Sequence, residues 1–424
     1  GDDVAVFIQQ VALAVALEHG AEVPAMAVVI GELRILVLVI VFPDILEKVQ
    51  VRPFAPGGSA FGIAVQHLPA PLGIHLVADT LGLLFVIGTL ALALLLWPRE
   101  PRDAPREHAL TLLLVGSANG IALSGDLFNI FVFYEILSVA SYGLAAGRAL
   151  GAAYAASLRY LVLGATGSAL ALLGIALVYA ATGSLSLQHI AGMSTTGLEG
   201  TLGLAAFALM VLGFGVKAEL FPVNTWVPEV YGAATPRVSG LLAGAVSKLA
   251  LLAVVKVLWT VVPGGDAWTL LLVVGLVTLV GGELAALRSN DTIRILSYSS
   301  IGQLGFAAVA YAAPGPEGLI AGTAVALHHL LVKPALFLLV AGWPRSLDAL
   351  VATGRAHPLQ GAVFVLLALS LIGVPPLPGF WAKYLLLKAV LATGDPLYFL
   401  AVVVVLTATV IEAAYLFRMA GRLF

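Results

Sequence analysis

Long apolar runs alternate with short polar stretches along nearly the whole chain. A membrane-spanning helix needs about 20 largely apolar residues, and about thirteen such segments fit between Val4 and Arg418. The pattern therefore predicts an all-α polytopic membrane protein with about thirteen transmembrane helices. The predicted segments are Val4 to Leu17, Val23 to Phe42, Ile74 to Trp97, Ala109 to Leu123, Leu127 to Ala146, Tyr154 to Ala181, Leu202 to Trp226, Val238 to Val262, Trp268 to Leu287, Ile295 to Ala313, Leu319 to Gly342, Leu359 to Thr393 and Leu397 to Phe417.

The arginine residues that lie between these segments, from Arg99 onward, fall on alternate loops. The loops 183–200, 263–267, 314–318 and 394–396 contain neither Lys nor Arg. By the positive-inside rule, the arginine-bearing side and the C-terminal end are expected to be cytoplasmic, in a multi-pass protein of the cell's inner (plasma) membrane. The arginines on that side are Arg99, Arg102, Arg106, Arg148, Arg237, Arg288, Arg294, Arg345, Arg355, Arg418 and Arg422.

The composition excludes several classes of protein. Of the 424 residues, 61% are hydrophobic and 10% are charged, which is too apolar for a soluble domain. The chain has no cysteine, so disulfides and cysteine-ligated metal or iron-sulfur centres are excluded. Nucleotide-binding and hydrolase motifs are also missing, and the net charge is only −2. We predict no cofactor, no metal site, no catalytic residue and no nucleic acid partner.

Two of the apolar segments are interrupted by proline. Lys217 is followed by Pro222 and Pro228, and about 150 residues later GVPPLPG interrupts the segment that contains Lys383. Broken helices at corresponding places in two halves are the sequence sign of an inverted-repeat transporter. We divide the chain into residues 1–107 (N-terminal helices and a charged loop), 108–262 (first repeat) and 263–424 (second repeat).

Charged residues inside the apolar segments are the candidate site, because charge inside a membrane usually marks an ion path or a paired site. Glu135, with hydroxyl side chains on its helical face, and Lys217 are the first candidates. Lys383, just after the second break, is the next candidate. The alternative for Glu135 and Lys217 is a purely structural buried ion pair.

Further candidates lie in the later segments. Lys248 is in the middle of a span, where Gly240 and Gly244 predict the close approach of another helix. His328, His329 and Lys333 are clustered, and a histidine between lysines is suited to relaying protons; a structural role for either histidine is the alternative.

The other charged residues in apolar segments have simpler interpretations. Lys256 is either part of the path or a residue that extends to the membrane surface. Glu219, Glu283 and Glu412 also lie in apolar segments: Glu283 is expected to pair with Arg288, and Glu412 has no partner evident in the sequence. Asp79 and Asp126 are expected to cap helices.

Five stretches, GDLFNIFVFYEILSVASYGL, GVKAELFPVNTWVPEVYGAATPRVSGLLAGAVSK, DTIRILSYSSIGQLG, HHLLVKPALFLL and GVPPLPGFWAKYLLLKA, occur in one order. Together they resemble the antiporter-like subunits shared by respiratory complex I, membrane-bound hydrogenases and Mrp sodium/proton antiporters, and most of all the Mrp D type. The resemblance implies two inverted five-helix repeats joined by a hydrophilic axis. It also implies roles for Glu135 and Lys217 as the coupling pair, Lys248 as the central relay, His329 and Lys333 as the bridge, and Lys383 as the exit-side lysine.

The resemblance favours a proton-translocating member of a multisubunit membrane complex, most simply the D-type component of an Mrp sodium/proton antiporter. Its partners would be other membrane subunits, the lipid bilayer, protons and, in one version, sodium ions. One alternative is the proton-pumping component of a complex I-like NADH:quinone oxidoreductase or a membrane-bound hydrogenase, in which the chain would at most be the ion-pumping part of an enzyme. Another alternative is a membrane scaffold that transports nothing.

Overall fold

The computed structural model describes residues 50–53, 61–64, 75–98, 104–148, 151–193, 197–198, 200–262, 264–351 and 353–424, and this part of the chain is almost entirely helical. The predicted segments Val4 to Leu17 and Val23 to Phe42 lie outside the described residues. The elements are β1 (Gln50–Pro53), β2 (Phe61–Ala64), β3 (His75–Ala78), α3 (Thr80–Leu95), α4 (Ala104–Leu123), α5 (Leu127–Ala145), η2 (Ala146–Arg148), α6 (Gly151–Thr182), α7 (Leu187–Ala191), α8 (Thr201–Gly215), α9 (Val227–Ala233), α10 (Pro236–Leu241), η3 (Leu242–Val246), α11 (Ser247–Thr260), α12 (Gly265–Arg288), α13 (Thr292–Tyr311), α14 (Pro316–Leu339), η4 (Val340–Gly342), η5 (Leu347–Leu350), α15 (Thr353–Ala356), α16 (Pro358–Ile372), α17 (Pro378–Ala392) and α18 (Pro396–Leu423).

The helices are long and apolar, as the sequence predicts, and the protein is a polytopic membrane protein. Among the described residues, six helices are long and apolar enough to cross a membrane, or seven if one bent helix pair is counted as a single span. The predicted count of about thirteen is therefore not reproduced. Part of the difference is physical: the apolar helices α3 and α8 have only 16 and 15 residues, and a helix interrupted by proline is divided into short pieces.

Both predicted helix breaks are present. The chain leaves helical geometry after α8 ends at Gly215 and resumes it at α9, and the Phe221-Pro222 peptide bond between them is cis. The second break separates α16 from α17 at Gly373, whose φ of 91° suits glycine, and contains the cis bond Pro375-Pro376. Each break thus places irregular backbone, with isolated turn hydrogen bonds in place of a continuous helical ladder, next to a lysine inside the bundle.

The helix starts follow local chemistry. Asp79 accepts a hydrogen bond of 2.6 Å from the backbone N–H of Gly82 at the start of α3. Asp126 accepts bonds of 2.9 and 3.0 Å from the N–H groups of Phe128 and Asn129 at the start of α5. The predicted capping roles of Asp79 and Asp126 are confirmed.

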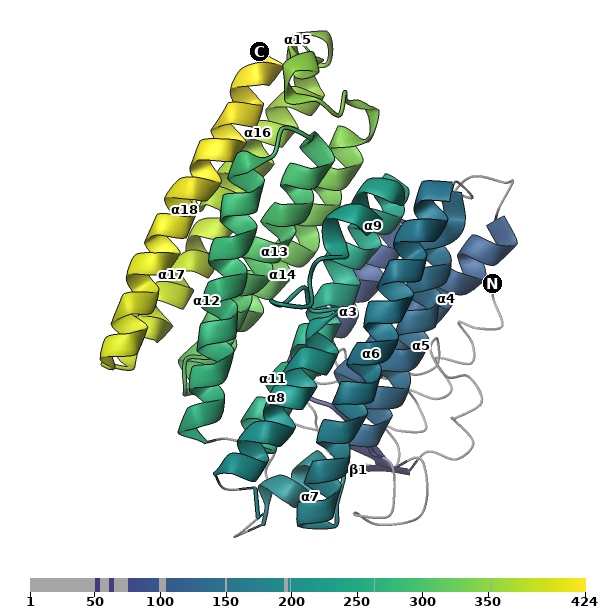
Figure 1. Ribbon diagram of the computed structural model, residues 1–424, viewed down its shortest axis with the longest axis vertical. Helices are drawn as coiled ribbons and strands as arrows, with labels where there is room; N and C mark the ends of the chain where they lie inside the picture. Colours follow the sequence, from purple (N-terminus) through teal and green to yellow (C-terminus); the bar gives the residue numbers. More distant parts are fainter. Residues whose placement is uncertain are drawn as a thin grey trace, which may run out of the picture.

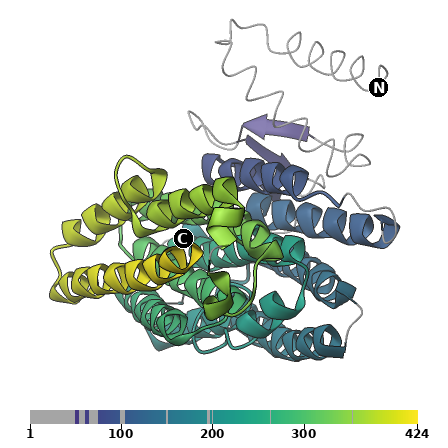
Figure 2. The same ribbon diagram turned by 90° about the horizontal axis from the view of Figure 1, so that it is seen from above.

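A small antiparallel sheet in the order β1-β2-β3 is the main departure from the helical pattern. Residues 50–53 and 61–64 fall in a stretch rich in Pro and Gly, and β3 occupies the start of the segment that was predicted to be helical from Ile74. The helix begins only at Thr80 because residues 75–78 pair with β2, Gly62 lying opposite Val77. Figure 2 shows the strand arrows beside the dark blue helices α3 and α4, which β3 contacts.

Helix α14 lies between helices from separate parts of the chain. In Figure 1, α4 and α5 lie at one edge of the bundle and α12 and α18 at the other, and α14 packs against both α10 and α17. A Cβ atom added to Gly244 would lie 2.8 Å from Cγ of Pro334, and one added to Gly240 would lie 3.3 Å from Cβ of the same proline. The predicted close approach at these two glycines is therefore confirmed; α14 approaches through Pro334, and α3 approaches Gly244 through Leu92.

Three of the arginines assigned to one side of the membrane lie at one end of the bundle, Arg237, Arg345 and Arg418. Arg345 forms an ion pair of 3.1 Å with Asp291, and Arg418 donates a bond of 2.7 Å to the carbonyl of Ser289. Arg237 forms an ion pair with Glu107 at the start of α4. The C-terminus lies at this same end in Figure 1, and α7 lies at the opposite end.

Candidate functional site

Lys217 lies in the first helix break and is completely buried. Its Nζ is 4.3 Å from the centre of the Tyr134 ring, 5.1 Å from that of Tyr142 and 5.6 Å from that of Tyr160. It also donates a hydrogen bond of 3.2 Å to the hydroxyl of Tyr142. An ammonium group is attracted to aromatic ring faces, so three tyrosines stabilise this cation inside the bundle.

Glu135 lies on α5 close to this lysine, and the Ser168 hydroxyl of α6 donates a hydrogen bond to its Oε1. Both side chains are in the described part of the chain, and no ion pair joins Glu135 to Lys217 there; their charges interact through space. The hydroxyls of Ser138 and Ser141, expected beside Glu135, bond to carbonyls of their own helix. The carboxylate and the ammonium are thus neighbours with separate polar partners.

Glu219 lies two residues beyond Lys217 and connects the break to the centre of the bundle. Its φ of 58° is in the left-handed region, which is uncommon for a residue other than glycine. The Tyr231 hydroxyl donates a bond of 2.6 Å to Oε1, whereas the buried Oε2 has no hydrogen-bond partner among the described residues. The carboxylate interacts electrostatically with Lys248. The backbone break therefore turns this acid inward, toward the middle of the bundle.

Lys248 is completely buried and follows a π-helical turn, η3. Its Nζ donates to the carbonyl of Ala243 and, at 3.0 Å, to the hydroxyl of Ser247. Single π turns within α-helices frequently occur at functional sites. Within the part of the chain that the structure describes, the lysine has no acidic side chain in direct contact and interacts through space with Glu219 and Lys333.

The predicted cluster on α14 is divided between two environments. Lys333 is completely buried and donates a bond of 2.7 Å to the Ser299 hydroxyl. His329 is also buried, and neither of its ring nitrogens has a hydrogen-bond partner in the described part of the protein. His328 instead lies toward α16, with its Nε2 2.9 Å from the Ser370 hydroxyl. Lys333 and His329 therefore face the interior, between the two halves.

Lys383 follows the second break and is held by an acid that the sequence could not assign to it. Its Nζ lies 2.5 Å from Oε2 of Glu412 on α18 and 4.6 Å from the centre of the Phe306 ring. Gln303 donates a bond of 2.6 Å to the other oxygen of Glu412. Glu412, which had no evident partner in the sequence, is thus the counter-ion of Lys383.

Glu283 corrects one expectation. It was expected to pair with Arg288, but it is completely buried and neither carboxyl oxygen has a hydrogen-bond partner among the residues described. The reason is helical geometry: Glu283 lies on the face of α12 that packs against α13 and α18, away from the helix end that carries the arginine.

Lys256 is likewise not a surface residue. Its side chain is buried, and its Nζ donates bonds of 3.2, 2.6 and 2.9 Å to the carbonyls of Ile121, Ala122 and Ser124. These carbonyls belong to the C-terminal end of α4, which has no further helical turn to supply donors. Lys256 is therefore a helix cap supplied by a neighbouring helix.

The buried ionisable groups form a succession through both halves, which we term the buried axis. Glu135 and Lys217 interact electrostatically, as do the members from Glu219 to Lys383, and Lys217 and Glu219 are two residues apart in the first break; Glu135 lies at one end, half-buried. Among the described residues no group of His, Cys, Asp and Glu is arranged to hold a metal ion. The members are Glu135, Lys217, Glu219, Lys248, His329, Lys333, Glu283, Glu412 and Lys383.

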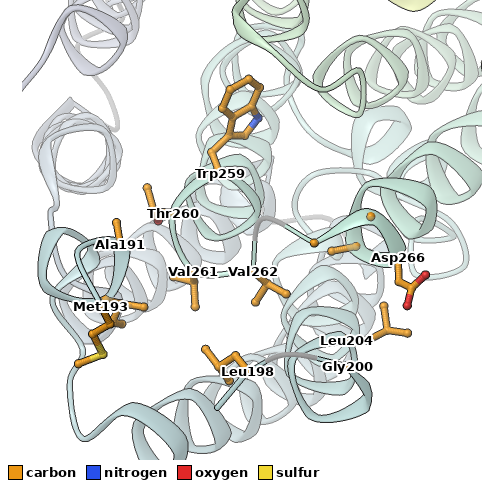
Figure 3. A pocket seen from close by; sticks show the side chains of 14 residues that line it. Ala191, Met193, Leu198, Gly200, Leu204, Trp259, Thr260, Val261, Val262 and Asp266 are labelled. Carbon is orange, nitrogen blue, oxygen red and sulfur yellow. The ribbon is translucent and has the colours of Figure 1, made fainter. Parts of the chain in front are cut away.

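A cavity of about 490 Å³ lies elsewhere, at the end of the bundle that carries α7. Figure 3 shows Trp259, Val261 and Val262 on one side and Leu198 on the other. The described residues that line the cavity include a single ionisable side chain, Asp266, and none of the buried axis. The candidate site is therefore the axis and not this cavity.

The buried axis coincides with a region shared by known proteins. The profile of the NADH:quinone oxidoreductase/Mrp antiporter transmembrane family matches residues 124–411, which contain every axis residue up to Lys383. The chain belongs to this family. Glu412 lies one residue beyond the matched region.

Some relatives within the family are named as NADH-quinone oxidoreductase subunits and others as cation/proton antiporter subunits. The chain is 33% identical over 380 residues to the N subunit of an NADH-quinone oxidoreductase of Desulforudis audaxviator, covering 85% of this chain and 75% of that one. It is 31% identical over 346 residues to the D subunit of a Na(+)/H(+) antiporter of Alkalihalophilus pseudofirmus. This match covers 77% of this chain and 70% of that one. It is 34% identical over 392 residues to the D subunit of a probable K(+)/H(+) antiporter of Rhizobium meliloti, covering 81% and 71%.

Solved structures show the same fold. A chain of the Mrp complex from Dietzia superposes with a TM-score of 0.77 at 28% identity, covering 99% of this chain and 75% of that one. A chain of an archaeal membrane-bound sulfane sulfur reductase superposes with a TM-score of 0.79 at 29% identity. This match covers 99% of this chain and 88% of that one. The family fold and the multi-pass membrane character predicted from the sequence are thus confirmed.

Sequence reasoning missed three acids of the axis. Glu219, Glu283 and Glu412 were each visible as charges within apolar segments, which was the available signal. Their partners could not be recognised, because Gln303 and Glu412 are 109 positions apart and Lys383 and Glu412 are 29 apart.

Proposed function

We propose that this chain is a proton-translocating, antiporter-like subunit of a multisubunit membrane complex, specifically the D-type component of an Mrp cation/proton antiporter that works with sodium. The observation that carries the proposal is the buried axis, which continues from the first helix break to the second. Buried charge in a membrane is expensive and is kept where an ion path needs it. The Mrp and antiporter relatives support the same assignment.

The axis supplies a role for each group. Lys217 would exchange a proton with Glu135 and Lys248 would receive it, with Glu219 balancing its charge. His329 and Lys333 on α14, with His328 beside them, would pass the proton to the second half. Lys383 would release it when its ion pair with Glu412 opens. We infer that residues 108–262 and 263–424 act as two repeats that share this path, and that the C-terminal end is cytoplasmic.

The test is cation-driven proton movement in vesicles that contain the complete complex, with Glu135→Gln and Lys383→Ala. Both variants are expected to assemble and to lose exchange. Lys388→Ala is the matched control, because Lys388 is exposed on the same helix as Lys383 and lies outside the axis. Normal exchange in both axis variants would contradict the proposal and favour the scaffold alternative.

A second candidate function is the proton-pumping subunit of a complex driven by electron transfer. The 33% identity to the N subunit of an NADH-quinone oxidoreductase favours it. Affinity purification of the tagged chain in mild detergent separates the two: iron-sulfur or NADH-oxidising partners indicate a pump, whereas small hydrophobic subunits and one larger relative indicate an antiporter.

A further inference from the structure

Glu283 differs from the other acids of the buried axis in the hydrogen bonding of its carboxyl group. It lies on α12, is completely buried, and neither carboxyl oxygen has a hydrogen-bond partner within the described ranges. Its carboxyl group occupies space left by a glycine of α13, because a Cβ atom added to Gly302 would collide with Oε1 of Glu283. The helices therefore approach closely at this point, and the carboxyl group is enclosed by protein.

The surroundings of Glu283 contain charged groups from three helices. Lys333 on α14, Lys383 on α17 and Glu412 on α18 all interact electrostatically with it. The Tyr415 hydroxyl lies beside it and interacts with both the Glu283 carboxyl group and the Ser299 hydroxyl. Glu412 already has the Lys383 ammonium at 2.5 Å, so that pair is balanced.

Two groups of this cluster remain without a directly bonded partner of opposite charge in the described part of the chain, Lys333 and Glu283. The hydrogen bond of Lys333 goes to a neutral group, the Ser299 hydroxyl. An isolated buried carboxylate is far more costly than a neutral carboxylic acid. Transfer of one proton from the Lys333 ammonium to the Glu283 carboxylate breaks an N–H bond, forms an O–H bond and leaves two neutral groups. The net charge of the cluster does not change, which suits a low-dielectric interior.

We propose that Glu283 is a proton-carrying residue that takes its proton from the Lys333 ammonium and delivers it to the Glu412 carboxylate, where the new O–H bond replaces the one broken on Glu283 and neutralises the counter-ion of Lys383. This connects α14 to the second helix break, where direct contact between the charged groups is otherwise missing among the described residues. The inference rests on the proposed function, which it extends by a carrier that the sequence had assigned to an ion pair at a helix end.

The test compares Glu283→Gln with Glu283→Asp in vesicles that contain the complete complex. The Gln variant cannot carry a proton and is expected to slow exchange roughly 100-fold, while the Asp variant retains part of the rate. Glu317→Gln is the control, because Glu317 is exposed in the first turn of α14 and is expected to leave the rate unchanged. A wild-type rate for Glu283→Gln beside inactive Glu135→Gln would overturn this inference alone; wild-type rates for both would overturn the proposed function.

Infrared difference spectroscopy supplies a readout that a purely structural role would not change. The protonated Glu283 carboxyl is expected to give a C=O stretching band that shifts in heavy water. The band should be lost in Glu283→Gln and kept in Glu317→Gln. If Glu283→Gln does not assemble, Glu283→Asp carries the test: a displaced band supports the assignment and an unchanged band overturns it.

Discussion

The Nζ of Lys383 lies 2.5 Å from Oε2 of Glu412, whereas Lys217, at the first helix break, lies against tyrosine rings. The two broken helices therefore present their lysines in different electrostatic states. One lysine is neutralised by a direct counter-ion, and the other has an acid, Glu135, only at a distance. A proton that moves between the two breaks would therefore meet one lysine with a directly bonded counter-ion and one lysine without.

The Lys383 and Glu412 pair predicts a characteristic pattern of stability. Removing one partner leaves the other charge buried and unpaired, which costs about 3–5 kcal/mol. Lys383→Met and Glu412→Leu are each expected to lower the thermal inactivation midpoint of the detergent-solubilised complex. The double variant should be closer to wild type than either single one, and a double loss equal to the sum of the singles would contradict the pairing.

Lys256 predicts a loss of stability without a loss of transport. Lys256→Met removes the ammonium donor from the carbonyls of Ile121, Ala122 and Ser124, of which Ile121 still accepts from the N–H of Ser124, and should destabilise by about 1–3 kcal/mol. Lys256→Arg keeps donors at this position and should restore most of the stability. The exchange rate per assembled complex should stay near wild type in both variants, and abolished exchange in well-assembled Lys256→Met would place this lysine on the path.

Gly244 predicts a steric effect at the contact between the two halves. A Cβ atom there would collide with Cδ2 of Leu92 and lie 2.8 Å from Cγ of Pro334, so Gly244→Ala is expected to destabilise by about 1–3 kcal/mol. Gly281→Ala is the control, since nothing in the described part of the chain lies within 4 Å of a Cβ atom at that position. The thermal stability of the purified complex is measured for both variants. If Gly244→Ala is as stable as Gly281→Ala, α14 can move away from this contact.

Orientation is testable because these 424 residues contain no cysteine. The positive-inside rule predicts that the end of the bundle carrying Arg345, Arg418 and the C-terminus is cytoplasmic. Gly421→Cys should react with a membrane-impermeant maleimide only when the cytoplasmic face is accessible, and Asp266→Cys, at the opposite end of the bundle, only from outside. The reverse labelling pattern would invert the topology.

The helical repeat explains why the sequence predicted some features of the site and missed others. Pro222, Pro228 and the GVPPLPG stretch break helices through local backbone chemistry, so both breaks could be placed from the sequence. Gly240 and Gly244 likewise indicated a close helix contact. The helical repeat predicts which face of α12 carries Glu283, but it does not predict which helix packs against that face. For this reason the expected pairing with Arg288 was wrong.

The sequence by itself determined the membrane class, the two breaks, the family and the lysines of the candidate path, because these depend on apolar length, proline and short motifs. Only the tertiary structure decided that Glu412 neutralises Lys383, that Lys256 caps α4 and that Glu283 lies enclosed between α12 and α13. These relationships join helices from separate parts of the chain, and the free energy of a buried charge depends on the group packed opposite it.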